Sequence, residues 1–207
     1  MFQLIKRLTP LLFLLLLPLG SRAQVSREAV IARVAEANKA DGTLSFSFTR
    51  IRKTAMAAKD LVSEGKMIYG GTDRLRWEIT GPVKSLFILN GQRVLSENAR
   101  GRRVTDLSTD RRFQGIARNI AHAAAGSPVN ERDFRIEVLT SDKEWVLKMT
   151  PQRRELSALF QEIVLTADST TGLARRIVLR DLGGDTTTLQ IKDVVKGGAV
   201  APENFAF

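Results

Sequence analysis

The 207-residue chain contains no cysteine and a single histidine, His122. Cysteine thiolates and histidine imidazoles are the common ligands of zinc and iron–sulfur clusters, and they supply most protein nucleophiles and bases. We therefore expect no metal centre of these kinds, no disulfide, no cofactor and no histidine-based catalytic triad. The remaining enzyme candidates are the paired carboxylates Asp181 and Asp185, which flank Gly183-Gly184. Asp/Gly sequences usually form turns, so we favour a non-enzyme.

Long hydrophobic runs are also scarce, and the longest lies close to the N-terminus. Residues 11–17 are almost entirely leucine, follow Lys6-Arg7 and precede Ser21-Arg22-Ala23. This run is too short to span a membrane as a helix, which takes about 20 apolar residues, and its order is typical of a signal peptide. We predict that residues 1–23 are cleaved and that residues 24–207 form one exported domain. Lipid anchoring would need an N-terminal cysteine, which the mature chain lacks.

Acidic residues are outnumbered, with 22 Asp and Glu against 32 Lys and Arg and a net charge of +10. A basic surplus often indicates nucleic-acid binding, but an exported protein meets little nucleic acid. Anionic headgroups or an acidic partner are therefore the favoured counterparts, and a scattered, solvated cationic surface is an equally good interpretation. The basic stretch from Arg100 to Arg103 is expected to be rich in turns.

Two segments show helical periodicity. Val25–Lys39 has a possible N-cap at Ser26 and apolar residues at helical spacing, and the segment from Phe113 to Ala124 repeats the pattern. A short helical turn is also possible around residues 153–156. The inward sides of the two long helices are expected to be formed by Val30, Val34, Phe113, Ile116 and Ile120.

Most of the remaining chain alternates apolar and polar residues, which is typical of antiparallel strands with one buried face. We expect these strands near residues 44–49, 67–69, 74–80, 85–89, 134–138, 145–149, 160–167, 173–179 and 187–191. Asn90-Gly91, Thr171-Gly172 and the segment 183–185 are the predicted turns. Roughly ten such strands form one sheet that is large enough to curl toward a barrel.

The inward positions of this sheet carry bulky side chains. By alternation they are Phe46, Phe48, Met67, Tyr69, Leu75, Trp77, Ile79, Phe87, Leu89 and Trp145. Such a surface is filled either by packing of the protein's own helices or by a ligand. Aromatic stripes on strands are normally core, so the packed core is at least as good an interpretation as a ligand site.

Four sequence segments, taken in their order along the chain, resemble those of one protein family. They are Leu44–Thr49, Gly65–Tyr69, Leu75–Pro82 and the closing Gly198–Phe207. The combination resembles the periplasmic outer-membrane lipoprotein carriers, the LolA family, over essentially the whole mature chain. The resemblance implies a mostly β, α+β fold: an incomplete antiparallel barrel of ten or eleven strands with a helical lid over an apolar cavity.

The resemblance also implies a function and partners. The ten inward residues would line a cavity for the acyl chains of lipoproteins, and the five helix residues would belong to its lid. An inner-membrane lipoprotein-releasing ABC transporter would load this monomeric carrier, which would pass cargo to an outer-membrane receptor of the same fold. That receptor is anchored through a cysteine. The absence of cysteine from this chain therefore favours the carrier over the receptor. Alternatives are a periplasmic carrier or sensor of another lipid or glycolipid, and a structural envelope module with a packed interior.

Two positions depart from the family pattern. An arginine that helps to close the lid is common in the turn before the tryptophan strand, and Gly71 stands there in this chain. A glutamine commonly follows the Phe-Thr pair, and Arg50 replaces it. Arg74 and Arg76 are close to Gly71, but alternation directs both away from the inward face, so neither takes over the closing role.

We predict that Ile116→Glu or Ile120→Glu abolishes lipid binding and leaves the sheet folded, because either change places a charge on the inner side of the lid. Binding of a fluorescent fatty acid, followed together with far-ultraviolet circular dichroism, tests the placement. Unchanged fatty-acid binding would refute it.

Overall fold

The structure is a computed structural model that describes residues 25–40, 42–71, 73–109, 129 and 131–207. The expected signal peptide and the expected helix at 113–124, with Phe113, Ile116 and Ile120, lie outside the described residues, as does His122.

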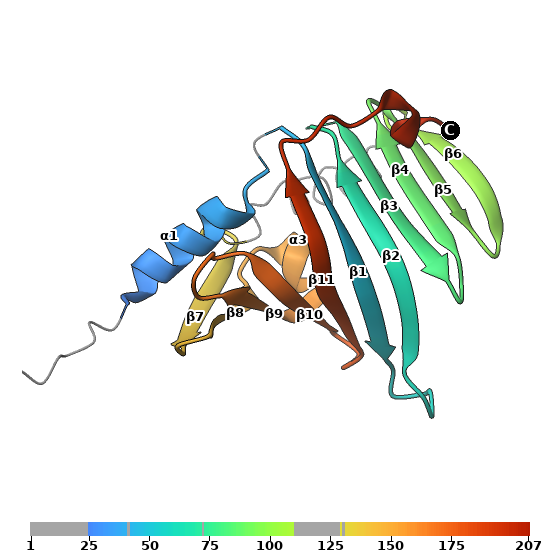
Figure 1. The fold of residues 1–207 in the computed structure, drawn as a ribbon. Helices are drawn as coiled ribbons and strands as arrows, with labels where there is room; N and C mark the ends of the chain where they lie inside the picture. The colour runs from blue at the N-terminus through green and yellow to red at the C-terminus, as the bar shows by residue number, and fades with distance from the viewer. Residues whose placement is uncertain (1–24, 41, 72, 110–128, 130) are drawn as a thin grey trace, which may run out of the picture.

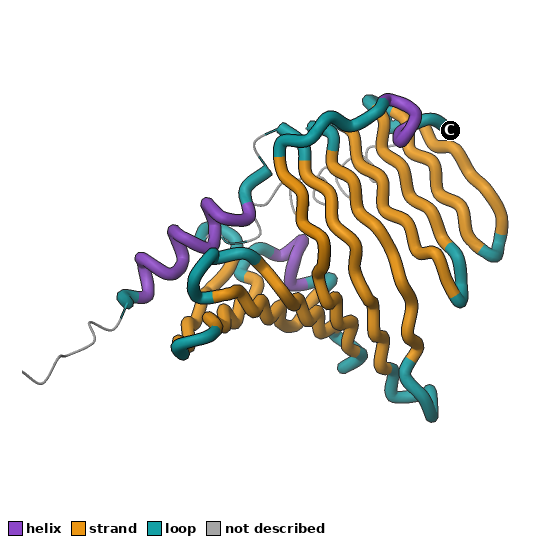
Figure 2. Tube along the Cα trace, in the orientation of Figure 1, coloured by secondary structure: helices purple, strands orange, loops and turns teal. Residues whose placement is uncertain are grey.

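The described chain is dominated by one antiparallel sheet of eleven strands (Figures 1 and 2). In chain order the strands are β1 Leu44–Lys53, β2 Leu61–Tyr69, β3 Arg74–Gly81, β4 Ser85–Asn90, β5 Arg93–Asn98, β6 Gly101–Asp106, β7 Phe134–Thr140, β8 Glu144–Pro151, β9 Phe160–Asp168, β10 Ala174–Asp181 and β11 Thr186–Lys196. Their order across the sheet is β6-β5-β4-β3-β2-β1-β11-β10-β9-β8-β7.

The sheet consists of two consecutive meanders that meet at one long-range strand pair. Strands β1 to β6 form the first meander, β7 to β11 the second, and β1 pairs with β11 from Leu44↔Lys196 to Lys53↔Thr186. Strands β6 and β7 are the two ends of the order, so the sheet is not closed. Strands β7–β10 bend away from the plane of the first meander (Figure 1). The expected incomplete antiparallel barrel is confirmed.

One expectation about the sheet was wrong. The basic stretch from Arg100 to Arg103 is not mainly a turn, because the turn is confined to residues 99–100 and β6 begins at Gly101. The alternating signal is weak here because β6 is an edge strand whose residues are almost all exposed, so nothing selects apolar residues for one face. Pairing with β5 defines the strand instead, with Glu97 opposite Arg102.

The apolar–polar pattern also failed to predict strand β5, for a different reason. Its consecutive residues Val94 and Leu95 are both buried, and they pack into different clusters on the two faces of the sheet. Because these two neighbouring residues are buried on opposite faces, both are apolar and the strand shows no alternation.

The predicted N-terminal helix is confirmed as α1, Arg27–Asn38. The Ser26 hydroxyl accepts a hydrogen bond from the Ala29 amide at 3.2 Å, which satisfies one of the free N–H groups of the first turn. Val30, Ile31 and Val34 form its buried side. The short helical turn is also confirmed, as α3, Arg154–Ser157.

The C-terminal segment covers part of the convex face of the first meander. It crosses the ends of the strands and forms a short 3₁₀ helix, η1 Pro202–Phe205 (Figure 1). Phe205 is 1% exposed and packs with Ile68, Ile88 and Leu95. A Cβ atom at Gly70 would lie 2.6 Å from the Phe205 ring, so this contact depends on glycine.

Arg74 and Arg76 lie on this convex face, as alternation predicted. The Arg74 guanidinium lies 5.6 Å from the centre of the Phe205 ring. Arg76 pairs with Glu78 at 2.7 Å and donates a hydrogen bond to the Asn204 carbonyl at 3.3 Å. Both arginines therefore fix the C-terminal segment and do not reach the inward face.

We predict that Phe205→Ala lowers the free energy of unfolding by about 3–5 kcal/mol, because it leaves a cavity under the C-terminal segment. Urea denaturation monitored by circular dichroism measures the change. Phe207→Ala is the matched control, since that ring is only partly buried and should cost clearly less. Equal losses in the two variants would contradict the anchoring role of Phe205.

Candidate functional site: an apolar concave face

The strand registers assemble the inward side chains of the first meander into rows that cross the sheet. Phe46 is opposite Met67, Met67 is opposite Trp77, and Trp77 is opposite Phe87. A second row runs from Tyr69 through Leu75 to Leu89. Because directly paired residues point to the same face, each row is a continuous apolar band on the concave side of the sheet.

The aromatic rings in these rows contact one another. The centre of the Phe48 ring lies 4.5 Å from that of Trp77 and 6.2 Å from that of Phe46. The Phe48 ring lies over Gly65, its partner on β2, and a Cβ atom there would be 2.4 Å from the ring. A glycine is therefore required for Phe48 to lie flat on the sheet.

Nine of the ten expected inward residues belong to this one cluster. The fully buried members are Phe48, Met67, Tyr69, Leu75, Ile79 and Leu89, whereas Phe46, Trp77 and Phe87 are partly exposed. These three, which we call the exposed aromatic row, offer accessible apolar surface on the concave side.

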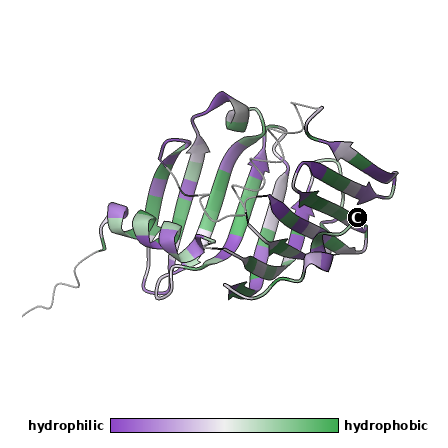
Figure 3. Cartoon of the chain, turned by 90° about the horizontal axis from the view of Figure 1, so that it is seen from above, coloured by the Kyte–Doolittle hydropathy of each residue, from purple (hydrophilic) through white to green (hydrophobic). Residues whose placement is uncertain are grey.

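Trp145, the tenth residue, belongs to a second cluster under α1. It packs with Val30, Val34 and Leu147, and α1 lies over the β7–β10 half of the sheet (Figure 1). Val30 and Val34, the described residues expected in the lid, are therefore 0% exposed and pack on the second meander, not on the exposed aromatic row. Figure 3 shows α1 across the strands, with hydrophobic and hydrophilic segments alternating along them.

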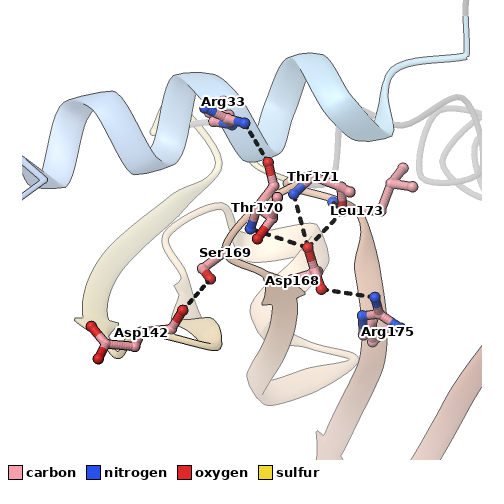
Figure 4. A network of polar contacts seen from close by, with 8 residues as sticks. All are labelled: Arg33, Asp142, Asp168, Ser169, Thr170, Thr171, Leu173 and Arg175. Atoms are coloured by element: carbon pink, nitrogen blue, oxygen red, sulfur yellow. Dashed lines mark hydrogen bonds and ion pairs between the residues drawn. The ribbon is translucent and has the colours of Figure 1, made fainter.

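Hydrogen bonds to the turn between β9 and β10 hold the C-terminal half of α1. Asn38 donates from Nδ2 to the Gly172 carbonyl at 2.8 Å and accepts from the Ala174 amide at 2.8 Å. The Arg33 guanidinium donates to the Thr170 carbonyl (Figure 4). The position of α1 therefore depends on the conformation of this turn.

Asp168 organises the turn. Its carboxylate accepts from the Thr171 amide at 2.8 Å, the Thr171 hydroxyl at 3.0 Å and the Arg175 guanidinium at 2.7 Å (Figure 4). Hydrogen bonds from Thr171, with that from Arg175, lower the pKa of Asp168 from 3.8 to about 2. The turn is therefore stabilised by the ionised carboxylate.

Two cavities lie next to the sheet. One, of about 40 Å³, lies where the two meanders and α1 meet, and Asn38, Leu44 and Phe46 are among the residues that line it. It has room for about one water molecule. The other, about 580 Å³, lies at the ends of β3 to β5 and contains only Ile79 of the expected inward residues. Neither of these two cavities contains Trp77 or Phe87.

The remaining polar candidates have structural roles. The Asp181 carboxylate accepts from the amides of Gly183 and Asp185, and Asp185 in turn accepts from the Ala55 amide at 3.1 Å. The Asp181 carboxylate therefore stabilises the β10–β11 turn, as the Asp/Gly pattern indicated, and the Asp185 carboxylate joins this turn to the β1–β2 connection. Within the described ranges, no group of His, Asp or Glu side chains could hold a metal ion.

Gly71 adopts a φ of +111°, which side-chain-bearing residues rarely adopt. The backbone conformation of this turn therefore favours glycine at position 71. The arginine that the resemblance associates with lid closure has no counterpart at this position.

These features define the class of the protein, an open antiparallel β-barrel with an apolar, partly aromatic concave face. The chain belongs to the family "Outer membrane lipoprotein carrier protein LolA", whose model matches residues 38–207. An outer-membrane lipoprotein carrier protein of Nitrosomonas europaea is 26% identical over 211 residues, which cover 97% of this chain and 95% of that protein.

A solved structure shows the same fold. An uncharacterised conserved protein of Thermus thermophilus superposes with a TM-score of 0.51 at 10% identity, covering 87% of this chain and 93% of that one. A LolA superfamily protein of Nitrosomonas europaea has a TM-score of 0.48 at 13% identity, covering 89% and 99%. No helix among the described residues is long and apolar enough to cross a membrane.

We predict that Asp168→Asn destabilises the protein at pH 7 and that the difference from wild type fades at low pH. The lowered pKa stabilises the fold above the unfolded-state value near 3.8, and this contribution is lost as pH falls toward about 2. Thermal unfolding at intervals from pH 7 to pH 2 measures the effect. Asp60→Asn, which removes an exposed carboxylate paired with Lys53, is the charge-matched control. A difference that stays constant across this range would contradict the assignment.

Proposed function

We propose that this protein is a periplasmic chaperone that holds the acyl chains of lipoproteins against its concave face and carries them from the inner to the outer membrane. The observation that carries the proposal is the exposed aromatic row, Phe46, Trp77 and Phe87, which is continuous with a buried apolar cluster in a LolA-family sheet. An inner-membrane ABC transporter would load the carrier, and an outer-membrane receptor of the same fold would accept the cargo where one is present.

The physical task explains the choice of surface. Exposing an acyl chain to water costs about 0.8 kcal/mol per methylene, which for a long chain is on the order of 10 kcal/mol. An apolar concave face removes that area from water without covalent chemistry, so the proposal includes no catalytic step. Partly exposed rings can move with little loss of packing, which allows release as well as binding.

The cargo can be identified directly. The exported chain is produced in a bacterial envelope with a candidate lipoprotein, purified without detergent, and analysed by native and denaturing mass spectrometry. A stoichiometric complex with triacylated lipoprotein supports the carrier. Phospholipid or glycolipid as the sole bound material would favour a carrier or sensor of another lipid, and the absence of any lipid would favour a packed structural module.

We predict that Phe87→Glu weakens binding of a synthetic triacylated lipopeptide at least about tenfold, because it places a charge within the exposed aromatic row. Fluorescence of Trp77 in a Trp145→Phe background reports binding. Leu139→Glu is the matched control: this leucine on β7 is 55% exposed and faces away from the concave side, opposite Val146. Similar affinity for all three proteins would exclude the exposed aromatic row as the binding surface.

A further inference from the structure

Two polar residues interrupt the apolar concave face at one place. Arg50 on β1 is directly opposite Ser63 on β2, so both side chains lie on the face that carries Phe48. They follow the aromatic rows toward the end of β1 at which Arg52 and Lys53 are exposed. The pair therefore lies between the apolar surface and the solvated rim.

Both residues hold buried polar atoms without a partner among the described residues. Arg50 Nε and Ser63 Oγ are enclosed and make no hydrogen bond, and Ser63 as a whole is 2% exposed. More than nine in ten buried polar groups are normally paired, because leaving one unpaired sacrifices its hydration. The two unpaired donors belong to directly opposite residues, so one acceptor group brought to this place could bond to both.

The described part of the protein supplies no negative charge for Arg50. The flanking concave positions on β1, β2 and β11 are occupied by Phe48, Arg52, Leu61, Gly65, Thr187, Leu189 and Ile191. None of them is acidic, and the Glu64 carboxylate is bonded to Thr49 on the opposite face. Burial and, second, repulsion from Arg52 lower the pKa of Arg50, yet an arginine stays charged at neutral pH.

The neighbouring basic residues differ from Arg50 in this respect. Arg52 lies 3.7 Å from the Asp185 carboxylate, and Lys53 lies 3.3 Å from that of Asp60. Among the described residues, Arg50 is thus the cation on this strand with no carboxylate at ion-pair distance, and its side chain is partly exposed and accessible to an anion from outside.

We propose that Arg50 and Ser63 form an anion-recognition site at the border of the apolar concave face, which binds the carboxylate or phosphate of an amphiphile whose chain lies on the aromatic rows. The inference rests on the proposed use of the concave face for acyl chains and adds a chemical selectivity to it. A guanidinium donates two parallel hydrogen bonds to such a group, and the serine hydroxyl donates a third.

The test compares three probes that share one chain: dodecanoate, dodecyl phosphate and uncharged dodecanol. Trp77 fluorescence in the Trp145→Phe background reports binding. We expect the wild-type site to bind the two anions at least about tenfold more tightly than dodecanol, as charge-assisted hydrogen bonds imply. Arg50→Gln should abolish this preference without weakening dodecanol binding, Arg50→Lys should restore part of it, and Ser63→Ala should reduce it.

Arg52→Gln is the matched control, because it removes one positive charge from the same strand and face but leaves the Arg50–Ser63 pair intact. It should preserve the preference. Thermal unfolding of Arg50→Gln provides the folding control, and its midpoint should not fall, since the variant loses a charge that has no partner among the described residues.

Three outcomes would overturn the inference. The first is equal binding of all three probes to the wild-type site, which would leave the apolar carrier proposal standing. The second is an equal loss of affinity for the anions and for dodecanol in Arg50→Gln, which would make Arg50 a structural residue. The third is inorganic phosphate that binds as tightly as dodecyl phosphate, which would indicate a site for free anions. Failure of every chain-bearing probe to bind would instead reject the apolar site itself.

Discussion

The pairing of β1 with β11 is the interaction on which the rest of the structure depends. Each meander is held by local hairpins, but the concave face exists only because Leu44–Lys53 pairs with Thr186–Lys196 across most of the sequence. A shift of this register by one residue would turn every side chain of one meander to the opposite face. The bulge between Ser45 and Ser47 marks where the pairing adjusts, next to Phe46.

The apolar faces of the two halves of the sheet are covered in different ways. The second meander is covered by α1, which buries Val30 and Val34 against Trp145 and is held by the Asp168 turn. On the first meander, Phe46, Trp77 and Phe87 stay partly exposed on the concave side, while Phe205 covers the convex side. This division separates a half whose apolar face is covered by a helix from a half whose apolar surface is partly accessible, which suits the carrier function that we propose.

The chain shares the fold of the LolA family, and two of its positions differ from the pattern that the resemblance led us to expect. Gly71 stands where the resemblance led us to expect an arginine, and its backbone conformation suits glycine. Arg50 brings a charge onto the concave face, where Ser63 is its cross-strand neighbour. The first position lies in the turn before the Trp77 strand, and the second lies at the border of the apolar face, where we propose that it recognises an anion.

Alternation and turn chemistry by themselves determined most strands, the α1 helix with its Ser26 cap, and the inward side of residues such as Phe48 and Trp77. These features follow from short-range patterns, because burial of one face imposes a period on the residues that form it. The pattern does not reveal strand β6, because an exposed edge imposes no such period. It does not reveal β5, because the buried residues Val94 and Leu95 are neighbours on opposite faces. Three features became apparent only in the folded chain. Trp145 is separated from the other inward aromatics, Phe205 packs under the C-terminal segment, and Arg50 lies opposite Ser63. Each depends on strand order or register between separate segments, which no local pattern in the sequence encodes.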